Sequence, residues 1–108
     1  MEDELLPDIE RARDLMEKRD FAACEALLST LMFQHPHDAV PHNLMGLLLE
    51  RRGSHLAAMR HFRAACALEP GYAPAAWNLE CYGEFARPHR CAFTAAECIA
   101  KTKKRGEV

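Results

Sequence analysis

The sequence contains no long apolar run, few glycines and few aromatic residues. Of its 108 residues, five are glycine and 7% are aromatic. No apolar stretch approaches the ~20 residues that a membrane-spanning helix requires, and the acidic start differs from the basic and then apolar build of a signal peptide. The net charge of -2 gives no field that would attract nucleic acid. We therefore expect a cytoplasmic protein whose partners are neither membranes nor nucleic acids.

Motifs that carry catalysis are also missing. No serine, cysteine or threonine stands in a nucleophile motif, and no glycine-rich loop is present to hold a phosphate. We therefore expect no enzymatic activity and no cofactor. The cysteines are odd in number, which favours reduced thiols over a disulfide framework; they are Cys24, Cys66, Cys81, Cys91 and Cys98.

Two groups of histidine and cysteine residues are the candidates for a metal site. Zinc requires three or four ligands that converge on one point. The first group, His35, His37 and His42, lies around an expected turn and has no cysteine near it in the sequence. The spacings of the second group match no zinc finger or zinc ribbon; its members are Cys81, His89, Cys91 and Cys98. We therefore expect no bound metal.

An internal repeat is what the sequence does contain. When the chain is shifted by 34 residues, Pro36 falls on Pro70 and Pro7 falls on Pro41. Positions for large apolar side chains align as well, since Leu28 falls on Phe62 under the same shift. A coherent set of matches at one interval is typical of proteins built from repeated supersecondary units.

Each unit of the repeat predicts two helices. From Ala39, apolar residues recur at helical spacing until Gly53, where the pattern breaks and Ser54 can cap a new helix. That second helix stops before Pro70, because proline disfavours helix in the residue that precedes it. Asp20 can cap the equivalent helix of the first unit. The expected helices span residues 5–18, 21–34, 39–52, 55–68, 73–86 and 90–104.

The middle unit, residues 39–72, resembles a tetratricopeptide repeat (TPR). It matches the family pattern at a set of small, aromatic and helix-ending positions: Gly46, Ala58, Phe62, Ala65 and Pro70. The resemblance implies that Gly46 and Ala58 let two antiparallel helices approach closely, and that Phe62 wedges between successive units. It also implies an all-α fold in which three tandem helix pairs, residues 5–38, 39–72 and 73–104, form a short right-handed superhelix.

The outer units match the family pattern less well. The third has Glu80 in place of the close-contact glycine and Ala96 in place of the wedge aromatic. Terminal units of a solenoid are commonly atypical, because one of their faces meets water. We expect the last helix to act as a cap, with Phe93, Ala96 and Ile99 on its packed face. The basic residues within 101–105 suit a helix C-terminus, or alternatively form a tail that contacts an acidic partner.

In the TPR family, a partner peptide usually lies in the concave groove formed by the first helix of each unit. The resemblance assigns a set of inward positions to that groove: Arg13, Asn43, Leu47, Arg51, Trp77, Asn78 and Phe85. Asn43 and Trp77 are expected to be exposed there, and they offer an amide and a large apolar surface to the peptide. The alternative is that Leu47, Trp77 and Phe85 pack against neighbouring helices.

The leading hypothesis is therefore a scaffold or adaptor that binds a peptide segment of another protein in this groove. A second hypothesis is a self-association module, in which the terminal helices of two copies stack to form a homodimer. A third is a regulatory component of a larger complex that acts on an enzyme elsewhere. All three are binding functions rather than catalytic ones.

Overall fold

The computed structural model describes residues 2–83 and 91–99. Within these ranges the chain is all-helical, with no strand and no helix that is long and apolar enough to cross a membrane. Its elements are the 3-10 helix η1 (Asp3–Leu5) and the α-helices α1 (Leu6–Glu17), α2 (Phe21–Gln34), α3 (Ala39–Arg51), α4 (His55–Leu68) and α5 (Ala73–Cys81). Residues 95–99 form a further helical segment. Phe85, His89 and the basic residues within 101–105 lie outside the described residues.

The backbone repeats at the interval seen in the sequence. Arg19 (φ 60°) and Gly53 (φ 81°) both adopt the left-handed conformation after the first helix of a pair. The next residue makes the same hydrogen bond in each case: the N–H groups of Asp20 and Ser54 donate to the carbonyl five residues earlier, at 2.9 and 2.8 Å. Bonds of this kind close a helix that ends in a left-handed residue. The pairs α1–α2 and α3–α4 are therefore two copies of one helix–turn–helix unit, offset by 34 residues.

Acidic side chains cap two of the helices. Asp20 Oδ1 accepts from the Ala23 N–H at 3.3 Å at the start of α2, and Asp38 Oδ1 accepts from the Val40 N–H at 2.9 Å at the start of α3. Each bond satisfies an amide group that has no partner within its own helix. The prediction for Asp20 is confirmed. Ser54 occupies the N-cap position of α4, but its side chain makes no capping hydrogen bond, so that prediction is wrong.

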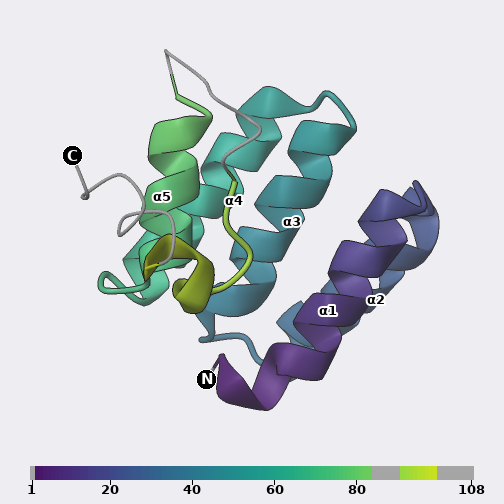
Figure 1. Ribbon diagram of the computed structural model, residues 1–108, viewed down its shortest axis with the longest axis horizontal. Coiled ribbons are helices and arrows are strands. Elements are labelled where there is room, and N and C mark those ends of the chain that lie inside the picture. Colours follow the sequence, from purple (N-terminus) through teal and green to yellow (C-terminus); the bar gives the residue numbers. More distant parts are fainter. Residues whose placement is uncertain (1, 84–90, 100–108) are drawn as a thin grey trace.

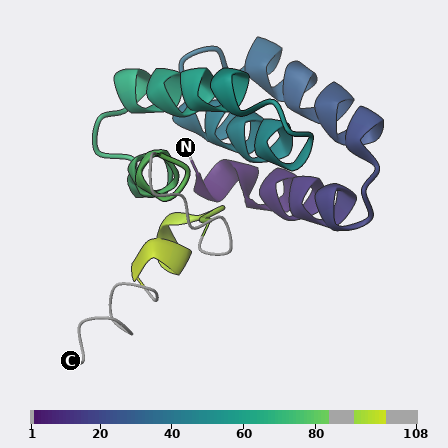
Figure 2. The same cartoon turned by 90° about the horizontal axis from the view of Figure 1, so that it is seen from above.

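The helices joined by short turns lie side by side as antiparallel pairs (Figure 1). Helix α3 is at the centre, since it contacts α1, α2, α4 and α5. From Ala39 to Leu48 its residues are buried, apart from the half-buried His42. Figure 2 shows that residues 91–99 lie on the side of the molecule opposite α2 and α4, next to α5.

An aromatic contact joins the α3–α4 pair to the end of α5. Phe62 of α4 is fully buried, and its ring lies against Gly46 of α3, where an added Cβ would come within 2.7 Å of Phe62 Cδ1. The same ring stacks on Tyr82, which directly follows α5, with ring centroids 5.7 Å apart and planes inclined by 12°. Phe62 therefore packs between Gly46 of α3 and Tyr82, and the missing side chain of Gly46 makes room for it.

The fifth helix is shorter than predicted. Helix α5 ends at Cys81 rather than at residue 86. The Gly83 N–H donates to the Glu80 carbonyl at 3.3 Å. This bond joins residues three apart, whereas α-helical bonds join residues four apart, and it marks the end of the regular helix. The predicted end is therefore wrong, because a turn at Tyr82 and Gly83 replaces the α-helix.

The last helix also begins later than predicted. Helical structure starts at Ala95 rather than at residue 90, because the main chain at Ala92 bonds to side chains of other helices instead of to its own neighbours. Of the three residues expected on the packed face, Phe93 is buried, whereas Ala96 and Ile99 are exposed. The cap predicted from apolar spacing is therefore wrong in these details.

Replacing Gly46 with alanine is expected to destabilise the protein, although alanine normally favours a helix over glycine by ~1 kcal/mol. The added methyl group would meet the buried Phe62 ring, and overpacking of this kind typically costs about 1–3 kcal/mol. Gly71→Ala is the matched control, because a Cβ added there meets nothing within 4 Å. Urea unfolding of the three proteins checks the expectation; a Gly46→Ala protein as stable as the wild type would contradict this packing.

Candidate functional site

Residues 91–99 pass in front of α3, between α5 and α1 (Figure 1). The residues around them come from three helices: Arg13 from α1, Asn43 and Arg51 from α3, and Asn78 from α5. Each of these side chains contacts a residue between 91 and 97. The candidate site is therefore the surface that these four residues share, which we call the groove after the prediction, and residues 91–99 of the same chain are bound to it. We call residues 91–99 the docked segment.

Two buried asparagines hold the main chain of the docked segment. Asn78 Oδ1 accepts from the Ala92 N–H at 2.7 Å, and Asn78 Nδ2 donates to the Ala92 carbonyl at 2.7 Å. Asn78 Nδ2 also donates to Asn43 Oδ1 at 2.8 Å, and Asn43 Nδ2 donates to the same Ala92 carbonyl at 3.2 Å. Both asparagines are fully buried, so these bonds satisfy amide groups that water cannot reach. The pair recognises a peptide backbone rather than a particular side chain.

Phe93 lies against two guanidinium groups. Arg13 Cζ is 4.3 Å and Arg51 Cζ is 5.4 Å from the centroid of the Phe93 ring. The attraction between a guanidinium and the face of an aromatic ring contributes about 0.5–2 kcal/mol, with the higher values where water is excluded. Phe93 is only 5% exposed, which favours the higher values. Arg51 is also held by its own helix, since its Nη1 donates to the Leu47 carbonyl at 3.3 Å.

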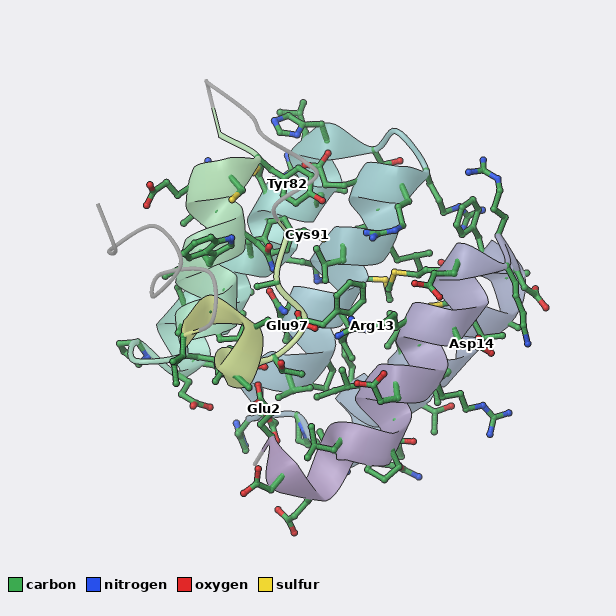
Figure 3. All side chains as sticks on the ribbon, viewed as in Figure 1. Glu2, Arg13, Asp14, Tyr82, Cys91 and Glu97 are labelled. Atoms are coloured by element: carbon green, nitrogen blue, oxygen red, sulfur yellow. The ribbon has the colours of Figure 1, made fainter. Side chains whose placement is uncertain are left out.

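Glu97 adds a charged contact to the same site. Its carboxylate accepts from Arg13 Nη2, and the two side chains meet in front of α3 (Figure 3). It also accepts from the Phe93 N–H at 2.7 Å. Burial by itself would raise the pKa of Glu97, but the hydrogen bonds from Phe93 and Arg13 outweigh it and leave the pKa below its ordinary value of 4.5. Glu97 is therefore an anion in the docked segment at neutral pH.

The N-terminal residues hold the helical part of the docked segment. The Glu2 carboxylate accepts from the Ala95 N–H at 3.1 Å and from the Tyr72 hydroxyl at 2.7 Å. Burial, followed by the hydrogen bond to Glu2, raises the pKa of Tyr72, so the phenol keeps its proton and donates a hydrogen bond to Glu2. This contact ties the start of the chain to the start of α5.

Cys91 anchors the other end of the docked segment. Its Sγ accepts from Arg51 Nη2 at 3.8 Å, and the residue lies beside Tyr82 (Figure 3). Burial, followed by the neighbouring Cys91, raises the pKa of the Tyr82 phenol. Because Tyr82 also stacks on Phe62, the docked segment is continuous with the core between the helix pairs.

The remaining predicted groove residues differ from the expectation in part. Asn43 is buried rather than exposed, because Ala92 of the docked segment covers it. Leu47 is fully buried in the core, which agrees with the alternative that it packs against neighbouring helices. Trp77 is half-buried on α5, and Phe85 lies outside the described residues.

Sequence reasoning missed the residues that the docked segment itself supplies. Phe93 was expected on a helix, and Glu97 was not singled out. Thr94 and Glu97 do have the spacing of a capping box, which marks a helix start, and Thr94 Oγ1 accepts from the Glu97 N–H at 3.3 Å. That signal predicts a helix beginning at Ala95. No local signal marks Glu2, because its contacts join opposite ends of the chain.

The histidine and cysteine groups do not form a metal site in the described residues. His42 pairs instead with His61 of α4, with their Nδ1 atoms 3.0 Å apart and their ring centroids 5.2 Å apart. Burial lowers the pKa of both imidazoles, so the pair is neutral at physiological pH. Among residues 2–83 and 91–99, no three histidine, cysteine or acidic side chains are arranged to hold a metal ion.

Comparisons of this chain with protein-family models, with curated proteins and with solved structures find no match. Amide and guanidinium groups line the groove, and these are groups that bind main-chain atoms, aromatic rings and carboxylates.

Asn78→Ala is expected to loosen the docked segment. The change removes both bonds to Ala92 and one to Asn43, and a buried polar group left unpaired costs about 1–3 kcal/mol. The Ala92 amide should then exchange its hydrogen at least ~10-fold faster than in the wild type. Glu80→Ala, an exposed change on the same helix, is the control. An unchanged Ala92 exchange rate in Asn78→Ala would show that the asparagines do not hold the segment.

Acid is expected to release the docked segment through Glu97. Docking lowers the pKa of Glu97 below 4.5, so the docked state binds fewer protons than the released state. Its stability is therefore fully present above 4.5 and is lost as the pH falls through the lowered pKa. In the Glu97→Gln protein the segment should dock less tightly at neutral pH, and the stability of the docked state should no longer contain the part that is lost in acid.

The Phe93 amide signal in NMR spectra reports this release, since that N–H donates to Glu97. Glu80→Gln makes the same change of charge at an exposed site and should follow the wild type during acid titration. If the Glu97→Gln protein shows the wild-type pH dependence, a group other than Glu97 causes the release of the docked segment in acid.

Proposed function

We propose that this chain is a protein-interaction module of the TPR family, which binds a peptide segment of a partner in the groove of α1, α3 and α5. The observation that supports this most directly is the docked segment. Asn43 and Asn78 bind the main chain of Ala92 through both its N–H and its carbonyl. Every peptide carries these main-chain groups, so a groove that binds them at buried positions suits a peptide ligand.

The helix pairs support the family assignment. The left-handed residues Arg19 and Gly53 recur at the 34-residue length of a TPR unit. Gly46 and Phe62 are in close contact, at positions where the family pattern has a small and a large residue. From these features we infer a short right-handed superhelix, with α5 and the docked segment in the place of the third helix pair.

The groups in the groove suit binding rather than catalysis. The guanidinium groups of Arg13 and Arg51 offer hydrogen-bond donors and no acceptor, and the amides of Asn43 and Asn78 are already paired with main-chain atoms. The proposed role is that of a scaffold or adaptor in the cytoplasm, with no enzymatic activity, no cofactor, and no contact with nucleic acid or membrane.

Self-association is a second candidate, because apolar side chains are exposed near both ends of the described chain. Leu6 in α1 is 39% exposed and Ile99 is 68% exposed. Two copies that stack through these ends would form a dimer. Size-exclusion chromatography with light scattering separates the candidates, since a monomeric protein would remove the second one.

Binding in the groove is tested by locating the surface that a partner contacts. Partners are captured by crosslinking, and the crosslinked segment is then made as a synthetic peptide. In NMR titrations we expect this peptide to shift the side-chain amide signals of Asn43 and Asn78 and the indole signal of Trp77. Shifts confined to α2 and α4, around the exposed Phe33 and Leu56, would contradict the proposal.

A pair of substitutions gives the energetic test of the same proposal. The TPR resemblance assigns Trp77 to the groove. An aromatic residue at the centre of an interface typically contributes about 2 kcal/mol or more, so Trp77→Ala should weaken peptide binding by roughly 30-fold. Arg60 is exposed on α4, and Arg60→Ala should bind like the wild type. Circular dichroism confirms that each variant folds. The groove is not the site if folded Trp77→Ala retains its affinity while Arg60→Ala loses it.

A further inference from the structure

The docked segment occupies the surface that the proposed function assigns to a partner, and the inference made here rests on that proposed function. We propose that residues 91–99 are an intramolecular ligand that keeps the groove closed, and that a partner segment displaces them by offering the same chemistry. That chemistry is a small residue, an aromatic residue directly after it, and a carboxylate four positions beyond the aromatic residue.

The requirement for a small residue comes from the burial of Ala92. Ala92 has no exposed surface, while its N–H and its carbonyl both bond to Asn78. A longer side chain at this position would have to displace the groups that enclose it. Proline is also excluded at this position, because it lacks the N–H that donates a hydrogen bond to Asn78.

The requirement for an aromatic residue comes from the two arginines. Arg13 and Arg51 belong to different helices, yet both reach the Phe93 ring, at 4.3 and 5.4 Å from its centroid. The face of an aromatic ring attracts a cation, and an aliphatic side chain of similar size does not. The groove therefore favours phenylalanine, tyrosine or tryptophan at this position.

The requirement for a carboxylate follows from the burial of Arg13. Its side chain is only 28% exposed, and its Nε is buried without a hydrogen bond, 3.7 Å from Glu10. A ligand without a carboxylate would bury the Arg13 guanidinium without an adequate counter-charge, and this burial would weaken binding. The spacing of four follows from Glu97, which turns back to the Phe93 N–H and so brings the ring and the carboxylate to the same arginine.

A ligand within the same chain competes strongly with one in solution. Tethering through a short connection corresponds to a concentration of roughly millimolar. A partner segment with identical contacts therefore binds only weakly to the wild-type chain. Any change that weakens the docked segment, and leaves the groove intact, should open the groove to an added peptide.

The test uses the full chain and a synthetic peptide with the sequence of residues 91–99, both kept under reducing conditions. Ala92→Pro in the full chain removes the N–H that donates to Asn78 and leaves Arg13 and Arg51 unchanged. We expect this variant to bind the peptide at least about tenfold more tightly than the wild-type chain does. Glu97→Gln in the full chain should act in the same direction, and it replaces Ala92→Pro if that variant does not fold.

Variants of the peptide test two of the three chemical requirements, the aromatic residue and the carboxylate, on the opened chain. Peptides with Phe93→Ala or with Glu97→Gln should each bind at least about tenfold more weakly than the unchanged peptide. Ala96 is exposed, so the Ala96→Ser peptide is the matched control and should bind equally well.

Several results would overturn the proposal. One is equal affinity of the peptide for the wild-type and the opened chain, another is binding of the Phe93→Ala peptide with full affinity. A third is a wild-type dimer in which the segment of one copy fills the groove of the other. If the peptide fails to bind but a captured partner still shifts the Asn43 and Asn78 signals, this inference falls and the proposed function stands. A partner that contacts only α2 and α4 removes both.

Discussion

Asn43 and Asn78 place two side-chain amides where water cannot reach them, and an amide left unpaired there would cost about 1–3 kcal/mol. Ala92 resolves this constraint, because its N–H and its carbonyl satisfy both asparagines at once. Helix α3, helix α5 and the docked segment are consequently held together by one small set of hydrogen bonds. The groove is stable when main-chain groups fill it, and in this structure the chain supplies them itself.

The other contacts extend from this point in both directions. Towards solvent, Phe93 and Glu97 compensate the half-buried Arg13 by an aromatic face and a carboxylate. Towards the core, Cys91 lies beside Tyr82 (Figure 3), and Tyr82 stacks on the buried Phe62 between the helix pairs. Release of the docked segment would therefore expose Arg13 on one side and Tyr82 on the other. A partner that replaces the segment must compensate the charge of Arg13 and cover Tyr82.

Local signals predicted the first four helices well, because their turns depend on nearby residues. The left-handed Gly53 and the capping Asp20 are examples of information that the sequence holds within a few positions. The resemblance to a known repeat also led to Asn43 and Asn78. The docked segment could not be predicted in this way, since Ala92 forgoes helical hydrogen bonds for partners on distant helices, and apolar spacing does not distinguish these cases. Buried amides without local partners are the remaining hint that another segment must reach them.

The most direct measurement of the central claim is the proximity of the asparagine amides to the docked segment in this chain. In NOESY spectra of the isotope-labelled chain, the side-chain amide protons of Asn78 should show cross-peaks to the Ala92 amide proton, since Asn78 Oδ1 is 2.7 Å from the Ala92 nitrogen. The Asn43 amide protons should show slow exchange with water, because that side chain is fully buried. Asparagine amides that exchange rapidly, with cross-peaks to water and none to residues 91–93, would contradict the account.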